Sequence, residues 1–168
     1  LTALQKTFVA MGRTFELFDL VPHIKSPENG FAMNGFEKTI DFKNVYFEYE
    51  KDTPVLKNFS LSVNKNETIA LVGNSGGGKS TVVSLLPRFY DVKSGSIEFD
   101  GVDIRKFDLK SLRNNIAFVF QDNFLFSGTI RDNIMMGNEG ATPEQLEKAI
   151  EMAHLDEFID ALDNGLDT

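Results

Sequence analysis

One segment of the chain combines the residue types that bind phosphate groups. Residues 73–80 read Gly-Asn-Ser-Gly-Gly-Gly-Lys-Ser, which fits the pattern G-x-x-x-x-G-K-[ST] in full. Glycines let a backbone wrap closely around phosphate oxygens, and successive N–H groups can then point inward as an anion-binding nest. Lys79 can reach β- and γ-phosphates, the Ser80 hydroxyl can bind Mg²⁺, and Thr81 is placed to meet an α-phosphate. The predicted cradle consists of Gly73, Asn74, Ser75, Gly76, Gly77, Gly78, Lys79, Ser80 and Thr81.

The elements on either side of this loop support a nucleoside triphosphate site. Thr68–Val72 is short and apolar, which predicts a strand buried on both faces. A helix is predicted from Gly78 to about Phe89, and its N-terminus adds positive potential at the phosphates. The alternative is a glycine-rich surface turn that matches the pattern by chance, and the flanking strand and helix disfavour it.

Further strands are predicted upstream and downstream of the loop. Runs of aromatic and β-branched residues favour strands. Asp100-Gly101 favours a two-residue hairpin turn, because both central residues of such a turn need positive φ. The predicted strands are Ile40–Tyr49, Val55–Val63, Ser96–Phe99, Val102–Ile104 and Ile116–Phe120.

The C-terminal part of the sequence predicts helices. Thr142 is placed as an N-cap, Pro143 occupies the first helical position and Gln145 completes a capping box. Asn164-Gly165 is expected to end the helical region. Its two apolar faces are predicted to be Leu146, Ala149, Ile150 and Ala153, then Leu155, Phe158, Ile159 and Leu162.

The N-terminal residues form a separate pattern. Apolar side chains recur at helical spacing over residues 1–20. They belong either to an amphipathic helix packed on its own domain or to the tail of a helix that descends from a membrane domain. Residues 22–38 carry turn and linker signals such as Pro22 and Asn29-Gly30, so the ordered domain is expected to start near Thr39. The recurring residues are Leu4, Phe8, Met11, Phe15 and Phe18.

Composition and charge exclude several classes of protein. The net charge is −8, from 17 basic and 25 acidic residues, and no basic patch interrupts it, so nucleic acid is not an expected partner. There is no cysteine, hence no disulfide framework. The sequence contains no run of 18 apolar residues, the length that could cross a bilayer, and no signal peptide is recognisable. His23 and His154 lack a partner histidine at metal-binding spacing.

Several segments outside the loop carry a family resemblance. Over about residues 39–168, the chain resembles the ATPase domain of ABC transporters of the exporter type. The segments are Phe47-Glu48-Tyr49, residues 54–61, Ser94–Ile97, Asp100-Gly101, Val119-Phe120-Gln121-Asp122 (similar to the Q-loop) and Phe124–Ile134. The resemblance implies an α/β fold: a P-loop NTPase core with an antiparallel β subdomain and the start of a helical subdomain.

The resemblance also implies roles for individual residues, with ATP and Mg²⁺ as cofactors. Tyr49 would stack on adenine and Val55 would lie beside the ribose or base. Gln121 would bind Mg²⁺ or the attacking water, which makes it a catalytic candidate together with Lys79. From the residues alone, the favoured interpretations are a core aromatic for Tyr49 and a solvated loop residue for Gln121. Phe124, Leu125 and Phe126 would help to form a groove for a coupling helix, or else a local hydrophobic cluster.

The domain organisation follows from the same resemblance. Residues 1–21 would continue a helix of a membrane domain, 22–38 would be a linker, and 39–168 the N-terminal part of the ATPase domain. The expected partners are the transmembrane domain of the same transporter and a second ATPase domain in a head-to-tail dimer. The chain would be held at the membrane by segments outside this sequence, on the cytosolic or organelle-matrix side.

The family has further motifs that this sequence does not contain. The LSGGQ signature, the Walker B strand with its acidic residues and the switch histidine would all follow Thr168. The chain is therefore expected to be part of a larger domain, to bind ATP without hydrolysing it, and to leave residues 68–72 and 116–120 without central neighbours. The alternatives are a soluble ABC ATPase without a membrane domain and a non-catalytic nucleotide-binding module.

Overall fold

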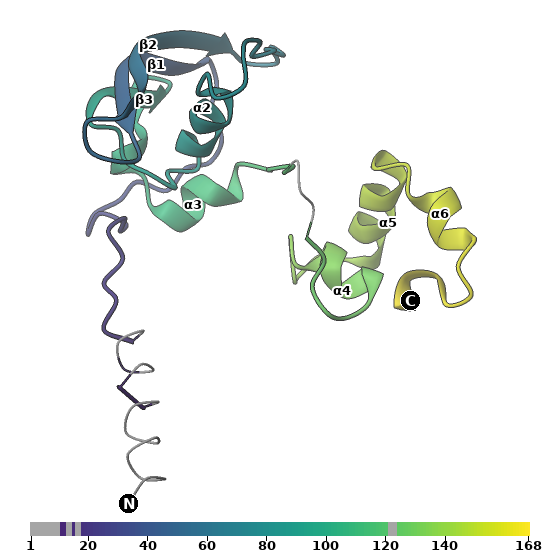
Figure 1. Ribbon diagram of the computed structural model, residues 1–168. Helices are drawn as coiled ribbons and strands as arrows, with labels where there is room; N and C mark the ends of the chain where they lie inside the picture. The colour runs from purple at the N-terminus through teal and green to yellow at the C-terminus, as the bar shows by residue number, and fades with distance from the viewer. Residues whose placement is uncertain (1–10, 13–14, 16–17, 121–123) are drawn as a thin grey trace, which may run out of the picture. The chain divides into compact units, whose positions relative to one another are not determined.

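The computed structural model describes residues 11–12, 15, 18–120 and 124–168 (Figure 1). Contacts divide the chain into two compact units, Leu1–Ala117 and Phe118–Thr168. The first unit contains the β-sheet and the phosphate loop, and the second contains three short α-helices.

The first unit is built on a four-stranded antiparallel sheet in the order β2-β1-β3-β4. In the register, Ile40 lies opposite Val63 on one side and Phe99 on the other. The sheet confirms the predicted antiparallel β subdomain, with strand ends within two residues of those expected. The strands are β1 (Thr39–Glu48), β2 (Pro54–Asn64), β3 (Ser94–Phe99) and β4 (Val102–Asp103).

The β3–β4 hairpin turns where the sequence predicts it. Asp100 and Gly101 have φ values of 50° and 79°, as a two-residue turn requires. The predicted strand Val102–Ile104 is one residue too long, since Ile104 begins the 3₁₀ helix η1 (Ile104–Lys106). The Asp103 side chain accepts a hydrogen bond from the Arg105 N–H and thereby caps this turn. A capped helical turn satisfies backbone groups that an edge strand would leave to water.

Helix α2 (Lys79–Leu85) follows the phosphate loop and lies against the sheet (Figure 1). Its buried residues Val82 and Leu85 join the core formed by the inward-facing residues of the strands. The helix is shorter than the predicted Gly78–Phe89. Pro87 lacks the backbone N–H that would continue the helical hydrogen bonds, and Arg88 then adopts a φ of 54°. The core includes Phe42, Val45, Phe47, Leu56, Val82, Leu85, Ile97 and Phe99.

Two predicted strands do not form. Residues 68–72 and 116–120 are not part of any strand and pair with none of the strands in the described residues. Their side chains include Val72 and Val119, which are 89% and 90% exposed. An apolar run forms a buried strand only where neighbouring strands supply partners for its N–H and C=O groups. The result agrees with the expectation that both segments lack central neighbours.

Residues 22–38 lie along the first unit without forming a regular element of their own. The Phe31 N–H donates to the Lys106 carbonyl and the Asp108 N–H donates to the Phe31 carbonyl, both at 2.9 Å. Asn115, at the end of α3 (Leu109–Asn114), donates through its side-chain amide to the carbonyl of the buried Met33 at 2.8 Å. The packed structure therefore begins upstream of Thr39, earlier than the sequence predicts.

The second unit consists of short helices around a small core. The predicted capping box is confirmed: the Gln145 N–H donates to Thr142 Oγ1 at 3.3 Å, and the Thr142 N–H donates to Gln145 Oε1 at 2.9 Å. Leu146, Ile150 and Ile159 form the buried core. The elements are α4 (Ile130–Met135), α5 (Pro143–Met152), α6 (Asp156–Asp160) and the 3₁₀ helix η2 (Gly165–Asp167).

Few of the N-terminal residues are described. Met11, Gly12, Phe15 and Phe18 have helical geometry, whereas Leu4 and Phe8 of the predicted amphipathic stripe lie outside the described residues. Within the described part of the chain, no helix is both long and apolar enough to span a bilayer.

Candidate functional site

The phosphate loop has the backbone geometry that its glycines predict. Gly73, Gly76 and Gly78 all have positive φ, at 152°, 78° and 81°. The Gly77 N–H donates to the Asn74 carbonyl at 3.1 Å and closes a turn within the loop. Gly78 also needs the absence of a side chain, because a Cβ there would lie 2.9 Å from Leu56 Cδ2. The loop is therefore seated on the start of β2 while its residues 73–77 stay exposed.

Lys79 spans this loop from the first turn of α2. Its Nζ donates to the Gly73 carbonyl at 2.9 Å and to the Asn74 carbonyl at 2.7 Å. An ammonium group has three N–H donors, so two hold the loop and one remains for another acceptor. The positive charge is thus held at the loop, where it would attract an anion.

Two hydroxyl groups follow Lys79 and differ in their surroundings. Ser80 is exposed on the first turn of α2. Thr81 is buried, and its Oγ1 lies 3.1 Å from the Tyr49 hydroxyl oxygen. This hydrogen bond connects the phosphate loop to the end of β1.

Tyr49 is brought to the loop by the β1–β2 connection. Its ring makes perpendicular contacts with Phe47 and Tyr90, with centroids 4.8 and 5.1 Å apart. The residue is nevertheless 52% exposed. Tyr49 is therefore held in place but still offers ring surface to a ligand, which the core alternative does not explain.

Val55 also lies at the loop. Its Cγ1 and carbonyl oxygen are 3.3 and 3.4 Å from the position that a Cβ of Gly78 would take. The structure thus brings Tyr49, Val55 and the predicted cradle residues into one region of the first unit. Gln121 lies outside the described residues, so its predicted role stays a prediction.

The cradle fits a phosphate group on structural grounds. A Cβ on Gly76 would meet nothing within 4 Å, so the loop is open at this point. Among the described residues, no group of three or more His, Asp or Glu side chains is arranged to hold a metal ion. Mg²⁺ in nucleotide sites commonly uses only one or two protein ligands together with phosphate oxygens and water. The exposed Ser80 hydroxyl fits that donor set.

The second unit has an apolar cavity of about 510 Å³ next to the predicted groove residues. Leu125 and Phe126 line it, and both are exposed. Asn133 fixes the backbone here: its Oδ1 accepts from the Phe126 N–H at 2.8 Å, and its Nδ2 donates to the Phe126 carbonyl at 3.1 Å. The other lining residues are Gly128, Ile130, Asn133, Ile134, Leu155, Phe158, Ile159 and Thr168.

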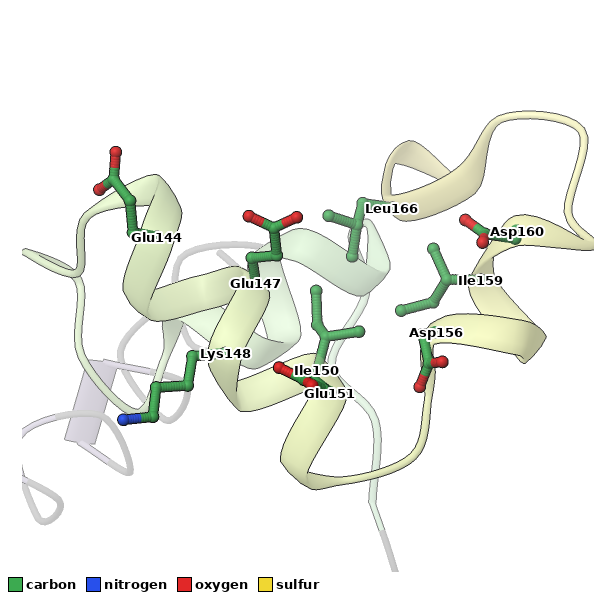
Figure 2. Close-up of a pocket in the computed structure, with 9 residues that line it drawn as sticks. All are labelled: Glu144, Glu147, Lys148, Ile150, Glu151, Asp156, Ile159, Asp160 and Leu166. Carbon is green, nitrogen blue, oxygen red and sulfur yellow. The ribbon is translucent and has the colours of Figure 1, made fainter.

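A larger cavity of about 700 Å³ in the same unit was not predicted from the sequence. Figure 2 shows Ile150, Ile159 and Leu166 pointing toward one another from α5, α6 and η2. Acidic side chains surround this apolar floor, so the cavity repels a triphosphate. Two of its floor residues, Ile150 and Ile159, belong to the predicted apolar helix faces, but their spacing does not predict a cavity. The charged lining residues are Glu144, Glu147, Lys148, Glu151, Asp156 and Asp160.

Sequence reasoning also missed Tyr90. This residue follows α2, and its ring contacts both Phe47 and Tyr49. No pattern of spacing links positions 49 and 90, because their contact depends on how α2 packs against the sheet.

Comparisons with known proteins agree with the geometry. A family profile described as ABC transporter matches residues 56–165. The putative multidrug export ATP-binding/permease protein YgaD of Bacillus subtilis strain 168 is 46% identical over 168 residues. These residues are 99% of this chain and 29% of YgaD. The ATP-dependent lipid A-core flippase of Syntrophus aciditrophicus strain SB is 41% identical over 165 residues, 98% of this chain and 27% of the flippase.

A solved structure gives the same result. The structure of a bacterial Atm1-family ABC exporter with ATP bound matches 98% of this chain with a TM-score of 0.88 and 36% identity. The match covers 29% of that exporter chain, so this chain spans less than a third of the length of its relatives. The profile extends over more than half of the residues, the relatives share the sequence, and the solved exporter shares the fold: the chain belongs to the ABC transporter family.

Proposed function

We propose that this chain is the ATP-binding part of an ABC exporter, and that it binds Mg·ATP at the loop of residues 73–81. One observation carries the proposal: the open glycine loop, bridged by Lys79, lies next to a partly exposed aromatic ring, that of Tyr49. A nucleotide needs both features, a cradle for phosphates and a flat apolar surface for the base.

The triphosphate would bind at the exposed side of the loop. The remaining N–H of the Lys79 ammonium group is available to donate to a phosphate oxygen, while the other two keep the loop in shape. Loop N–H groups at the start of α2 would donate to further phosphate oxygens. The lysine therefore serves as both a structural bridge and a counter-charge.

Ser80 and Gln121 are the residues that would hold Mg²⁺ at this site. The bound ion supplies positive charge to the β- and γ-phosphate oxygens. Gln121 is also the proposed partner of the attacking water. The buried Thr81 hydroxyl would donate to the α-phosphate, and its bond to Tyr49 holds it at one place.

Adenine would stack on Tyr49, with Val55 at the edge of the base or ribose. The half-exposed Tyr49 ring has the surface for a stacking contact, and such contacts with bases are worth about 1–3 kcal/mol. Val55 touches the loop at Gly78 and so connects the base region to the phosphate region.

Transport would require a transmembrane domain and a second ATPase domain. The apolar cavity lined by Leu125 and Phe126 is the proposed seat of a coupling helix from a transmembrane domain. The names of the relatives, an export ATP-binding/permease protein and an ABC exporter, support this proposal. The chain would then work at a membrane and pair head-to-tail with a second ATPase domain.

Titration with a fluorescent ATP analogue in the presence of Mg²⁺ tests the proposed site. Lys79→Ala removes the counter-charge and the bridge across the loop, so we expect it to abolish most of the binding. Lys57→Ala is the matched control, because it removes the same charge from an exposed position on β2. Equal affinities for the Lys79→Ala variant and the unmodified chain would refute the assignment of the site.

A further inference from the structure

We propose that Tyr90 is a positioning residue for the base-binding surface of this site: it holds the Tyr49 ring in the orientation that accepts a purine. The inference rests on the proposed function, because it assigns a task within the same nucleotide site. Its motive is the pair of perpendicular ring contacts that Tyr49 makes with Tyr90 and Phe47.

The support around Tyr49 comes from three directions. Phe47 contacts its ring at an interplanar angle of 88°, and Tyr90 contacts it at the same angle. Its hydroxyl oxygen lies 3.1 Å from Thr81 Oγ1. Phe47 and Tyr90 also contact each other, with centroids 5.7 Å apart. A half-exposed side chain at the end of a strand would otherwise sample several rotamers.

The three supports differ in what they can contribute. Phe47 is buried in the core, and its loss would disturb the sheet. Thr81 is committed to the phosphate region. Tyr90 is itself exposed, and its ring contacts Phe47 at the edge of the core as well as Tyr49, so its loss should disturb the sheet less than the loss of Phe47.

Tyr90 follows the helix that begins with the phosphate-binding residues. Tyr49 is bound to α2 near its start through Thr81 and to the segment just after α2 through Tyr90. The same helix carries Lys79 and Ser80. The segment 79–90 therefore carries residues of the phosphate site and, through Thr81 and Tyr90, also contacts the Tyr49 side chain, whose ring would bind the base.

Holding the ring before binding removes an entropic cost from the binding step. Immobilising a side chain opposes association, and here the contact with Tyr90 has already restricted the ring. Tyr90 should then affect only ligands that carry a base. An inorganic triphosphate binds the same loop without touching Tyr49.

The test compares ATP with inorganic tripolyphosphate by calorimetric titration in the presence of Mg²⁺. For Tyr90→Leu we expect ATP affinity to fall about three- to tenfold, the range of an aromatic pair contact, with tripolyphosphate affinity unchanged. Tyr90→Phe keeps the ring, so this variant should bind ATP with the affinity of the unmodified chain. Tyr90→Met is a second variant without a ring, in case Tyr90→Leu fails to fold.

The outcomes separate this inference from the proposed function. Parallel losses for ATP and tripolyphosphate would give Tyr90 a merely structural role, and an unchanged ATP affinity in Tyr90→Leu would also overturn the proposal. Tyr49→Ala is the reference: if it lowers ATP affinity while Tyr90→Leu does not, the base surface stands and only the role of Tyr90 fails. If Tyr49→Ala has no effect, the stacking assignment itself is wrong.

Discussion

The two glycines at positions 76 and 78 allow packing and backbone strain to be separated in one experiment. Both have nearly the same positive φ, 78° and 81°. A Cβ on Gly76 would point into open space, whereas a Cβ on Gly78 would lie 2.9 Å from Leu56 Cδ2 and 3.3 Å from Val55 Cγ1. Alanine at either position is destabilised by the positive φ, but only at position 78 does its Cβ also collide with the start of β2.

The magnitudes follow from these surroundings. A non-glycine residue in the left-handed region costs roughly 1–2 kcal/mol, which applies to both variants. Leu56 belongs to the buried core and cannot move away freely, so Gly78→Ala adds an overpacking cost of about 1–3 kcal/mol. We expect Gly76→Ala to lower the free energy of unfolding by about 1–2 kcal/mol and Gly78→Ala by about 2–5 kcal/mol.

Urea unfolding followed by tyrosine fluorescence measures this difference. The chain has no tryptophan and three tyrosines, Tyr46, Tyr49 and Tyr90, all in the first unit. The signal therefore reports on the unit that contains the loop. With a urea dependence of about 2 kcal/mol per molar, the midpoints of the two variants should differ by roughly 0.5–1.5 M. Equal midpoints, or a lower midpoint for Gly76→Ala, would refute the packing of Gly78 against β2.

Two further predictions concern catalysis and pH. We expect no sustained ATP turnover from this chain, because its sequence has no apolar strand ending in Asp-Glu after Lys79 to orient the water. Phosphate release should appear in a longer chain that supplies this strand and the signature loop. Robust release by the 168-residue chain, abolished by Lys79→Ala, would contradict the reasoning. The pKa of Asp100 lies below its ordinary value because the Glu37 and Thr39 N–H groups donate to its carboxylate. The contribution of Asp100 to the stability of the fold is therefore present above the unfolded pKa of about 3.9 and is lost as the pH falls through the lower folded value. Urea midpoints from about pH 6 to about pH 3 should fall less steeply for Asp100→Asn, which tolerates the positive φ at this position, and an identical slope would exclude Asp100 as a contributor.

Elements with local signals could be predicted from the sequence. The Asp100-Gly101 turn and the Thr142 capping box depend on residues within a few positions of each other, and both occur in the structure. The phosphate loop belongs to the same class, since its glycines, Lys79 and Ser80 are consecutive. Its backbone geometry follows from the residue types alone.

Elements that depend on distant partners could not be predicted in the same way. The apolar runs 68–72 and 116–120 have strand composition, but a strand needs a neighbour and none in the described residues pairs with them. The seating of residues 22–38 depends on contacts such as that of Phe31 with η1, across more than 70 positions. The length of α2 is a different case. Pro87 is a local signal that the helix ends before it, and this signal should have outweighed the helical periodicity that extended the prediction to Phe89.

Binding of an anionic nucleotide by a chain of net charge −8 requires the attraction to be local. At physiological salt the Debye length is about 8 Å, so an exposed carboxylate farther than this from the loop is largely screened there, and a charge held at the loop itself has the greatest effect. The Lys79 ammonium group is fixed by two carbonyl groups of the loop itself, at 2.9 and 2.7 Å, and it does not depend on a distant carboxylate that would cancel its field. The loop thus keeps its positive charge before any phosphate arrives, whereas the cavity of the second unit has Lys148 among five acidic side chains around its floor of Ile150, Ile159 and Leu166.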